Sequence, residues 1–199
     1  MTTVPKGRPN RKALIVEAAE TLLRDRGLGG VTTRAVAEAV PCSEGAIYVH
    51  FEDRFALILE VLHASLPEML VPLHALQGKV GKGTPEKNLV TAVEGLLRFH
   101  GRVATMLCSL MTEPKLLERF RSSLEEGGKG PDRGILTLTN YIAEEQRLGR
   151  IGADVDAKMA ASSLMAGSFF HQFTQGLLGV GGKMNSRRLV RFAISASGK

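Results

Sequence analysis

Apolar side chains recur every three or four residues along most of the chain, and this spacing constrains the fold more than any other feature. In residues 11–25, Leu14, Ala18 and Leu22 fall on one side of a helix. No segment alternates apolar and polar residues as a half-buried strand does. We therefore predict an all-α fold. Beyond the first helix, we expect helices over 32–40, 43–51, 53–66, 85–102, 104–124, 135–147, 156–178 and 186–196.

Local signals mark where the first helices begin and end. Gly27 is a candidate C-cap of the first helix, and Pro41 stops the second because proline disfavours a helical residue before it. Ser43 and Asp53 are candidate N-caps of the third and fourth helices. Pro67 and Pro72 interrupt the fourth helix, so we expect it to kink or stop near residue 66.

These short helices predict two domains. Residues 1–54 read as a three-helix helix-turn-helix domain preceded by a basic N-terminal arm, and residues 55–199 as a larger helical domain. The two cysteines, Cys42 and Cys108, form no framework of disulfides, which favours a reduced, cytoplasmic compartment. The uncharged stretch between Lys158 and Lys183 is long enough to span a bilayer, but its serines, glutamines and glycines favour a buried or interface helix instead.

Net charge supports nucleic-acid binding only weakly. The chain carries +6 overall, but residues 1–54 hold eight Lys and Arg against seven Asp and Glu, which leaves +1. Residues 55–199 carry the remaining +5. The case for DNA binding therefore rests on the arrangement of residues in the predicted helix-turn-helix.

The predicted third helix has the anatomy of a DNA-reading helix. Such a helix must expose small or polar side chains at its N-terminal end in order to enter the major groove. Here Glu44, Gly45 and Ala46 follow the Ser43 cap, so the backbone can approach base edges closely. Tyr48 can reach a phosphate from the same helix.

The segment TTRAVAEAVPCSEGAIYVHFEDRFAL resembles the signature of the TetR family of one-component repressors, and the resemblance covers residues 11–60. Its most specific part is the S-x-G-x-x-Y-x-H-F run from Ser43 to Phe51, with a basic residue three positions later. The resemblance implies a homodimer that occupies a palindromic operator and leaves it when a small molecule binds the C-terminal domain. It therefore implies a sequence-specific transcriptional repressor.

The resemblance also implies roles for individual residues. Arg34 would pair with a guanine, and Glu44 would accept a hydrogen bond from a cytosine amino group. The positions that face bases are Arg34, Glu44, Gly45 and Ala46, and those that hold phosphates are Thr33, Ser43, Tyr48, His50 and Arg54. Taken singly, Tyr48 and His50 would be an ordinary half-buried aromatic residue and a surface histidine.

Three positions depart from the family pattern. Pro41 stands where the family usually has a turn glycine, and proline lacks the positive φ that glycine can adopt. Cys42 replaces a more typical aliphatic residue, and an alternative for it is a redox role within the reader, as we call the helix-turn-helix domain of residues 1–54. Arg54 replaces the common lysine and keeps its charge.

The resemblance further implies that the C-terminal domain supplies both the dimer contact and the effector site. Small residues on one face of the helix over 156–178, together with Phe192 and Ala193, would form the dimer contact; the alternative is an internal core. The small residues are Ala157, Ala160, Ala161, Leu164 and Ser168. The candidate lining of a site for an apolar effector is His63, Phe99, Met106, Met111, Met165, Phe169 and Phe173, although Met and Phe at this spacing are also common in plain cores. We further expect Pro67 to act as a pivot in the fourth helix, where the spacing of the two DNA-binding domains would change when a ligand binds.

The sequence contains no recognisable catalytic motif. The sequence holds no zinc spacing, no HExxH, no GxSxG and no GxxxxGK[ST] motif, so we expect no enzyme activity, metal or cofactor. Two alternatives stay open. One is an activator or architectural DNA-binding protein without a ligand, and the other is a helical ligand carrier or small enzyme.

Overall fold

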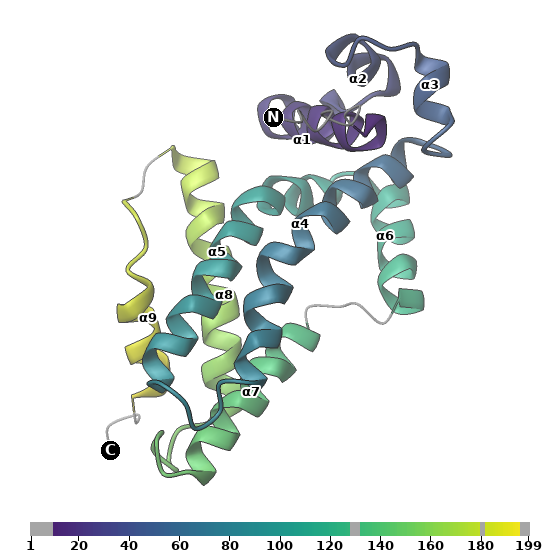
Figure 1. Cartoon of the computed structure of the whole chain (residues 1–199). Helices are drawn as coiled ribbons and strands as arrows, with labels where there is room; N and C mark the ends of the chain where they lie inside the picture. Colours follow the sequence, from purple (N-terminus) through teal and green to yellow (C-terminus); the bar gives the residue numbers. More distant parts are fainter. Residues whose placement is uncertain (1–9, 128–131, 180–181, 196–199) are drawn as a thin grey trace, which may run out of the picture.

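The computed structural model describes residues 10–127, 132–179 and 182–195 (Figure 1). Within these ranges every regular element is a helix, which confirms the predicted all-α fold. The helices are α1 (Arg11–Gly30), α2 (Thr33–Ala39), α3 (Glu44–Tyr48), α4 (Arg54–Gln77), α5 (Pro85–Leu110), α6 (Pro114–Gly127), α7 (Asp132–Arg147), α8 (Ala157–Leu178) and α9 (Ser186–Ile194).

Helix α5 lies at the centre of the molecule. It packs against α4 on one side and α8 on the other, while α7 closes the bundle against α4 and α8. Figure 1 shows α1, α2 and α3 grouped at one end of this bundle, where α1 rests on α4 and α5. Helix α9 lies against α5 and α8 at the flank, and α6 stands beside the start of α4. The buried apolar residues form one continuous cluster from Ile15 in α1 to Val190 in α9.

The stop predicted near residue 66 is wrong, because helix α4 continues through both prolines to Gln77. Proline lacks the N–H that would bind the carbonyl four residues earlier, so Pro72 leaves the Glu68 carbonyl without its helical donor. The backbone of α5 fits closely at this point, since a Cβ on Gly95 would lie 2.4 Å from the Pro72 ring and 2.6 Å from the Glu68 carbonyl oxygen. Close packing of α5 over the interrupted turn therefore offsets the cost of the proline.

The predicted end of the fifth helix near residue 102 is also wrong. We predicted a break between 102 and 104, but α5 runs without interruption to Leu110, and α6 begins with Pro114 at its first turn. The stretch over 99–106 stays helical because Phe99, Val103 and Met106 are buried at helical spacing.

Helix α8 turns a different face outward from the one expected. Ala160, Ala161, Leu164 and Ser168 are buried inside the protomer, so the internal-core alternative is the correct one for this face. Large exposed side chains of these two helices include Met159 and Phe170 on α8 and Phe192 on α9, at 64%, 64% and 75% exposure. Together with the exposed Ala166 they form what we call the α8–α9 apolar stripe.

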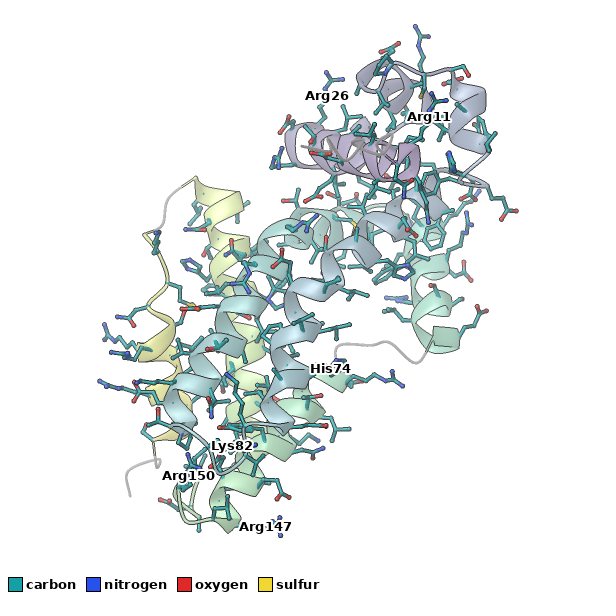
Figure 2. The ribbon with its side chains drawn as sticks, in the orientation of Figure 1. Arg11, Arg26, His74, Lys82, Arg147 and Arg150 are labelled. Atoms are coloured by element: carbon teal, nitrogen blue, oxygen red, sulfur yellow. The ribbon has the colours of Figure 1, made fainter. Side chains whose placement is uncertain are left out.

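A buried polar network fastens the end of the bundle farthest from α1–α3. The Glu145 carboxylate is fully buried, accepts a hydrogen bond from the Gly81 N–H at 3.2 Å and lies 3.2 Å from the Arg150 guanidinium. Arg150 also donates to the Gly83 carbonyl at 2.6 Å. Figure 2 shows Lys82, Arg147 and Arg150 at this end, whereas Arg11 and Arg26 lie near α1. The basic side chains are thus spread over both ends of the molecule.

Candidate nucleic-acid interface

The turn between α2 and α3 forms without a glycine. The Thr32 side chain caps α2 by accepting a hydrogen bond from the Ala35 N–H at 3.1 Å. Val40 then adopts an extended conformation, with φ −110° and ψ 123°, which is the conformation that a following proline requires. Pro41 therefore ends α2 as predicted, and the chain turns toward Ser43 without a residue of positive φ at Val40.

Helix α3 presents its N-terminal end to solvent. The Ser43 hydroxyl caps it by accepting from the Ala46 N–H at 3.3 Å. Ile47 is fully buried beneath it, and the following Phe51 anchors its other end in the core. Gly45 faces open space, since a Cβ there would meet only the Ser43 hydroxyl, at 3.8 Å. Helix α3 is therefore anchored in the core by its buried side, while its N-terminal end is open to solvent.

Three predicted DNA contacts gather where the first turn of α2 faces α3. The Thr33 hydroxyl lies 3.4 Å from the Glu44 carboxylate and 3.5 Å from the Tyr48 hydroxyl. Tyr48 is 55% exposed, so its phenol is accessible while its position is shared with both helices. This cluster joins α2 and α3 into one exposed polar surface.

The other predicted contacts surround this cluster. Arg34 is exposed and pairs with Glu38 one turn later, at 3.1 Å. His50 is exposed, with its ring edge toward Phe51. Sequence reasoning missed Val49, whose side chain is 80% exposed between Tyr48 and His50. An aliphatic residue two positions after the buried Ile47 gave no signal that it would be exposed.

Arg54, a predicted phosphate contact, has its guanidinium engaged within the protein. It donates to the Val31 carbonyl at 2.7 Å, also donates to the Leu28 carbonyl, and pairs with the Glu113 carboxylate at 3.2 Å. The side chain thereby joins the end of α1, the start of α4 and the turn before α6. The geometry favours a structural role over a phosphate contact.

We expect Arg54→Lys to lower the free energy of unfolding by about 1–3 kcal/mol, although it keeps the charge. Lysine cannot reproduce the planar fork that reaches two carbonyls and a carboxylate together. Urea unfolding of the variant and the parent checks this. Equal stability of the two proteins would show that the fork is dispensable and would restore the phosphate role.

A second ion pair ties α6 to the start of α4. The Asp53 carboxylate caps α4 through the Ala56 N–H at 2.8 Å and accepts from the Arg119 guanidinium at 2.6 Å. Burial alone would raise the pKa of Asp53, but these two hydrogen bonds together with the charge of Arg119 lower it below its ordinary value. Arg119 also lies over the Phe55 ring, 4.2 Å from its centroid. Helix α6 therefore contacts the segment that leads out of the reader.

The structure brings together only part of the predicted effector site. The Phe99 and Phe169 rings both contact the ring of His100, and Phe169 stacks on Phe173 with centroids 6.4 Å apart. Met106 and Met165 are buried in the core. His63 lies near Glu60 with a side chain 38% exposed, and Met111 is 75% exposed beyond the end of α5. These last two residues do not join the others.

Two short helices, a tight turn, a capped second helix with an open N-terminal end and polar groups around it define a helix-turn-helix protein. Among the described residues no group of three or more His, Cys, Asp or Glu is arranged to hold a metal ion. By length and composition α4 could cross a membrane, but here it packs against α1, α5 and α7 as a core helix.

Comparison with known proteins places this helix-turn-helix in a family. Residues 15–61 match the family model described as bacterial regulatory proteins, tetR family. The HTH-type transcriptional repressor KstR2 of Rhodococcus jostii (strain RHA1) is 27% identical over 100 residues, which is 49% of each chain. Residues 15–61 therefore form a helix-turn-helix domain of the kind found in tetR-family regulators. The match spans only about half the length of KstR2.

Solved structures share the fold over nearly the whole chain. A TetR-family regulator from Rhodococcus sp. has a TM-score of 0.68 and 19% identity, and the match covers 93% of this chain and 98% of that one. The fatty acid degradation regulator FadR from Bacillus halodurans has a TM-score of 0.64 and 14% identity, and the match covers 94% of each chain. At these identities the similarity concerns the fold alone.

Proposed function

We propose that this protein is a cytoplasmic, homodimeric transcriptional repressor that binds a palindromic operator and releases it when a small molecule binds the C-terminal domain. Residues 1–54 would read the DNA, and residues 55–199 would dimerise and bind the effector. The observation that carries the proposal is the exposed end of α3, with Glu44 and Tyr48 held against Thr33 of α2. That KstR2 is a repressor supports the direction of regulation.

In this proposal α3 enters the major groove with Glu44, Gly45 and Ala46 against the bases. The open space above Gly45 allows the backbone to approach a base edge. Arg34 reads a guanine from α2 after exchanging its contact with Glu38. The remaining contacts, to phosphates on both sides of the groove, come from Thr33, Ser43, Tyr48 and His50.

The α8–α9 apolar stripe supports the homodimer. Met159, Ala166 and Phe170 are spaced by seven and four residues, so they lie along one side of α8, and all are exposed in the protomer. A second copy packed on this stripe would remove large apolar side chains from water. It would also place two readers on one duplex, as half-sites about 34–36 Å apart require.

DNase footprinting of the region upstream of the protein's own gene tests the proposal. We expect protection of a palindrome whose two halves are one helical turn apart. The alternative of a ligand-free DNA-binding protein predicts protection that no small molecule relieves. A ligand carrier predicts no protected site on any DNA, and that result would overturn the proposal.

Arg34→Gln should weaken operator binding by about 10-fold or more and relax specificity at one base pair, because a bidentate arginine–guanine contact contributes about 1–3 kcal/mol. Arg147→Gln is the matched control. Both arginines are exposed and pair with a glutamate on their own helix, but Arg147 lies at the opposite end of the molecule (Figure 2). Fluorescence anisotropy with operator DNA and single-base variants measures both effects. Equal affinity of the two variants would remove Arg34 from the interface.

A further inference from the structure

A cleft lies between the C-terminal halves of α5 and α8, outside most of the residues predicted to bind an effector. Its volume is about 320 Å³, which falls at the lower end of the range for small-molecule sites. Of the seven predicted effector residues, Phe173 alone lines this cleft. The residues that determine its chemistry are Thr105, Cys108 and Ser109 from α5 and Gln172, Phe173 and Gly176 from α8.

The polar groups of the cleft are available to a ligand. Among the residues that the structure describes, the side chains of Thr105, Ser109 and Gln172 make no hydrogen bond within the protein. Two hydroxyls and an amide supply both donors and acceptors. Phe173 and the neighbouring Leu177 provide an apolar wall beside them. A molecule with one apolar face and one hydrogen-bonding edge matches this lining.

The cleft carries no charge. None of its lining residues is Asp, Glu, Lys, Arg or His. A charged ligand would lose part of its hydration on entry without gaining an opposite charge in return. The lining therefore selects a neutral molecule.

Gly176 keeps the cleft open. A Cβ at this position would have no heavy atom within 4 Å, so the missing side chain leaves space and relieves no clash. Glycine in a helix interior costs about 0.5–1 kcal/mol relative to alanine. The glycine thus lowers the stability of α8 while it leaves room in the cleft.

The cleft adjoins the contact between the bundle and the reader. Arg102, one turn before Thr105 on α5, donates to the Glu20 carboxylate of α1 at 2.7 Å. Arg102 also lies 3.9 Å from Glu68 of α4. A ligand that shifts α5 relative to α8 therefore moves the residue on which α1 is docked.

From these observations we infer that the α5–α8 cleft is a binding site for a small neutral molecule that combines an apolar body with hydroxyl, carbonyl or amide groups. Its use as the effector site rests on the proposed function. Its occupation would alter how α1 is held by Arg102.

The experiment titrates benzyl alcohol, a neutral probe with a ring and a hydroxyl, into the full-length protein and follows backbone amide signals by NMR. Benzoate and benzylamine, of similar size, serve as charged probes. Gly176→Leu fills the cleft, and Asn140→Leu adds the same side chain at an exposed position on α7. We expect saturable shifts over residues 104–112 and 172–177, at least tenfold weaker binding of both charged probes, and at least tenfold weaker binding of benzyl alcohol to Gly176→Leu but not to Asn140→Leu.

Shifts confined to other residues, or equal affinity of Gly176→Leu and the parent for benzyl alcohol, would overturn the site. Equal binding of the charged probes would overturn its selectivity for neutral molecules. Binding is measured without DNA, and footprinting is measured without the probe. A failure of the probe to bind in the cleft can therefore be distinguished from a failure of the protein to bind an operator.

Discussion

Gly95→Ala is expected to lower the free energy of unfolding by about 2 kcal/mol, whereas Gly176→Ala is expected to raise it by about 0.5–1 kcal/mol. Gly95 lies in the middle of α5 and Gly176 in the last turn of α8, so alanine has the higher helix propensity at both positions. The difference is what the new methyl group meets. At Gly95 it would lie 2.4 Å from the Pro72 ring and 2.6 Å from the Glu68 carbonyl oxygen, and at Gly176 it would meet nothing within 4 Å.

The atoms that face Gly95 cannot move aside cheaply. The proline ring is part of the α4 backbone, and the Glu68 oxygen belongs to the backbone as well, so α4 and α5 must separate to admit the methyl group. Urea unfolding of both variants at one protein concentration measures the two effects. A stabilised Gly95→Ala protein would show that the two helices are not in close contact at this point.

The second large effect concerns pH. The His100 ring is buried, and its Nδ1 lies 3.0 Å from the Ser168 hydroxyl, which itself donates to the Met165 carbonyl. Nδ1 is therefore the protonated nitrogen of a neutral ring. Burial lowers the pKa of His100 to about 4.

This lowered pKa makes the folded protein less stable in mild acid. In the unfolded chain histidine has a pKa near 6.5, so below that pH the unfolded state binds a proton that the folded state does not. The free energy of unfolding should fall by about 2 kcal/mol between pH 7 and pH 5, and the loss should level off below about pH 4.

Urea unfolding at pH 7, 6 and 5 measures this dependence. His100→Asn retains a donor near Ser168 but does not titrate, so this variant should lose the dependence even if it is less stable throughout. His50→Asn, at an exposed histidine, should keep it. If the parent and His100→Asn showed the same slope against pH, His100 would not be the group responsible.

The starts of α2, α3 and α4 could be predicted from sequence because the interactions that begin these helices are local. Thr32, Ser43 and Asp53 each cap a helix through an N–H three residues later. Pro41 likewise acts on its immediate neighbour. Such interactions need only a few consecutive residues and no knowledge of the rest of the fold.

Features that depend on distant contacts could not be predicted in this way. Pro72 stays inside α4 because Gly95, 23 residues away, allows α5 to pack against it. The outward face of α8 was misassigned because no charge between Lys158 and Lys183 marks a solvent side. The partners of Arg54, at Leu28, Val31 and Glu113, lie 23 to 59 residues away along the chain.

The internal bonding of Arg54 has a consequence for how a protein of this kind discriminates between DNA sequences. Cations that neutralise phosphates release counterions and strengthen binding to every sequence equally. In this reader Arg54 is bound internally, Lys12 pairs with Glu60, and Arg34 pairs with Glu38. If the protein binds DNA as proposed, Arg54 and Lys12 add little to the part of the binding free energy that is the same for every sequence.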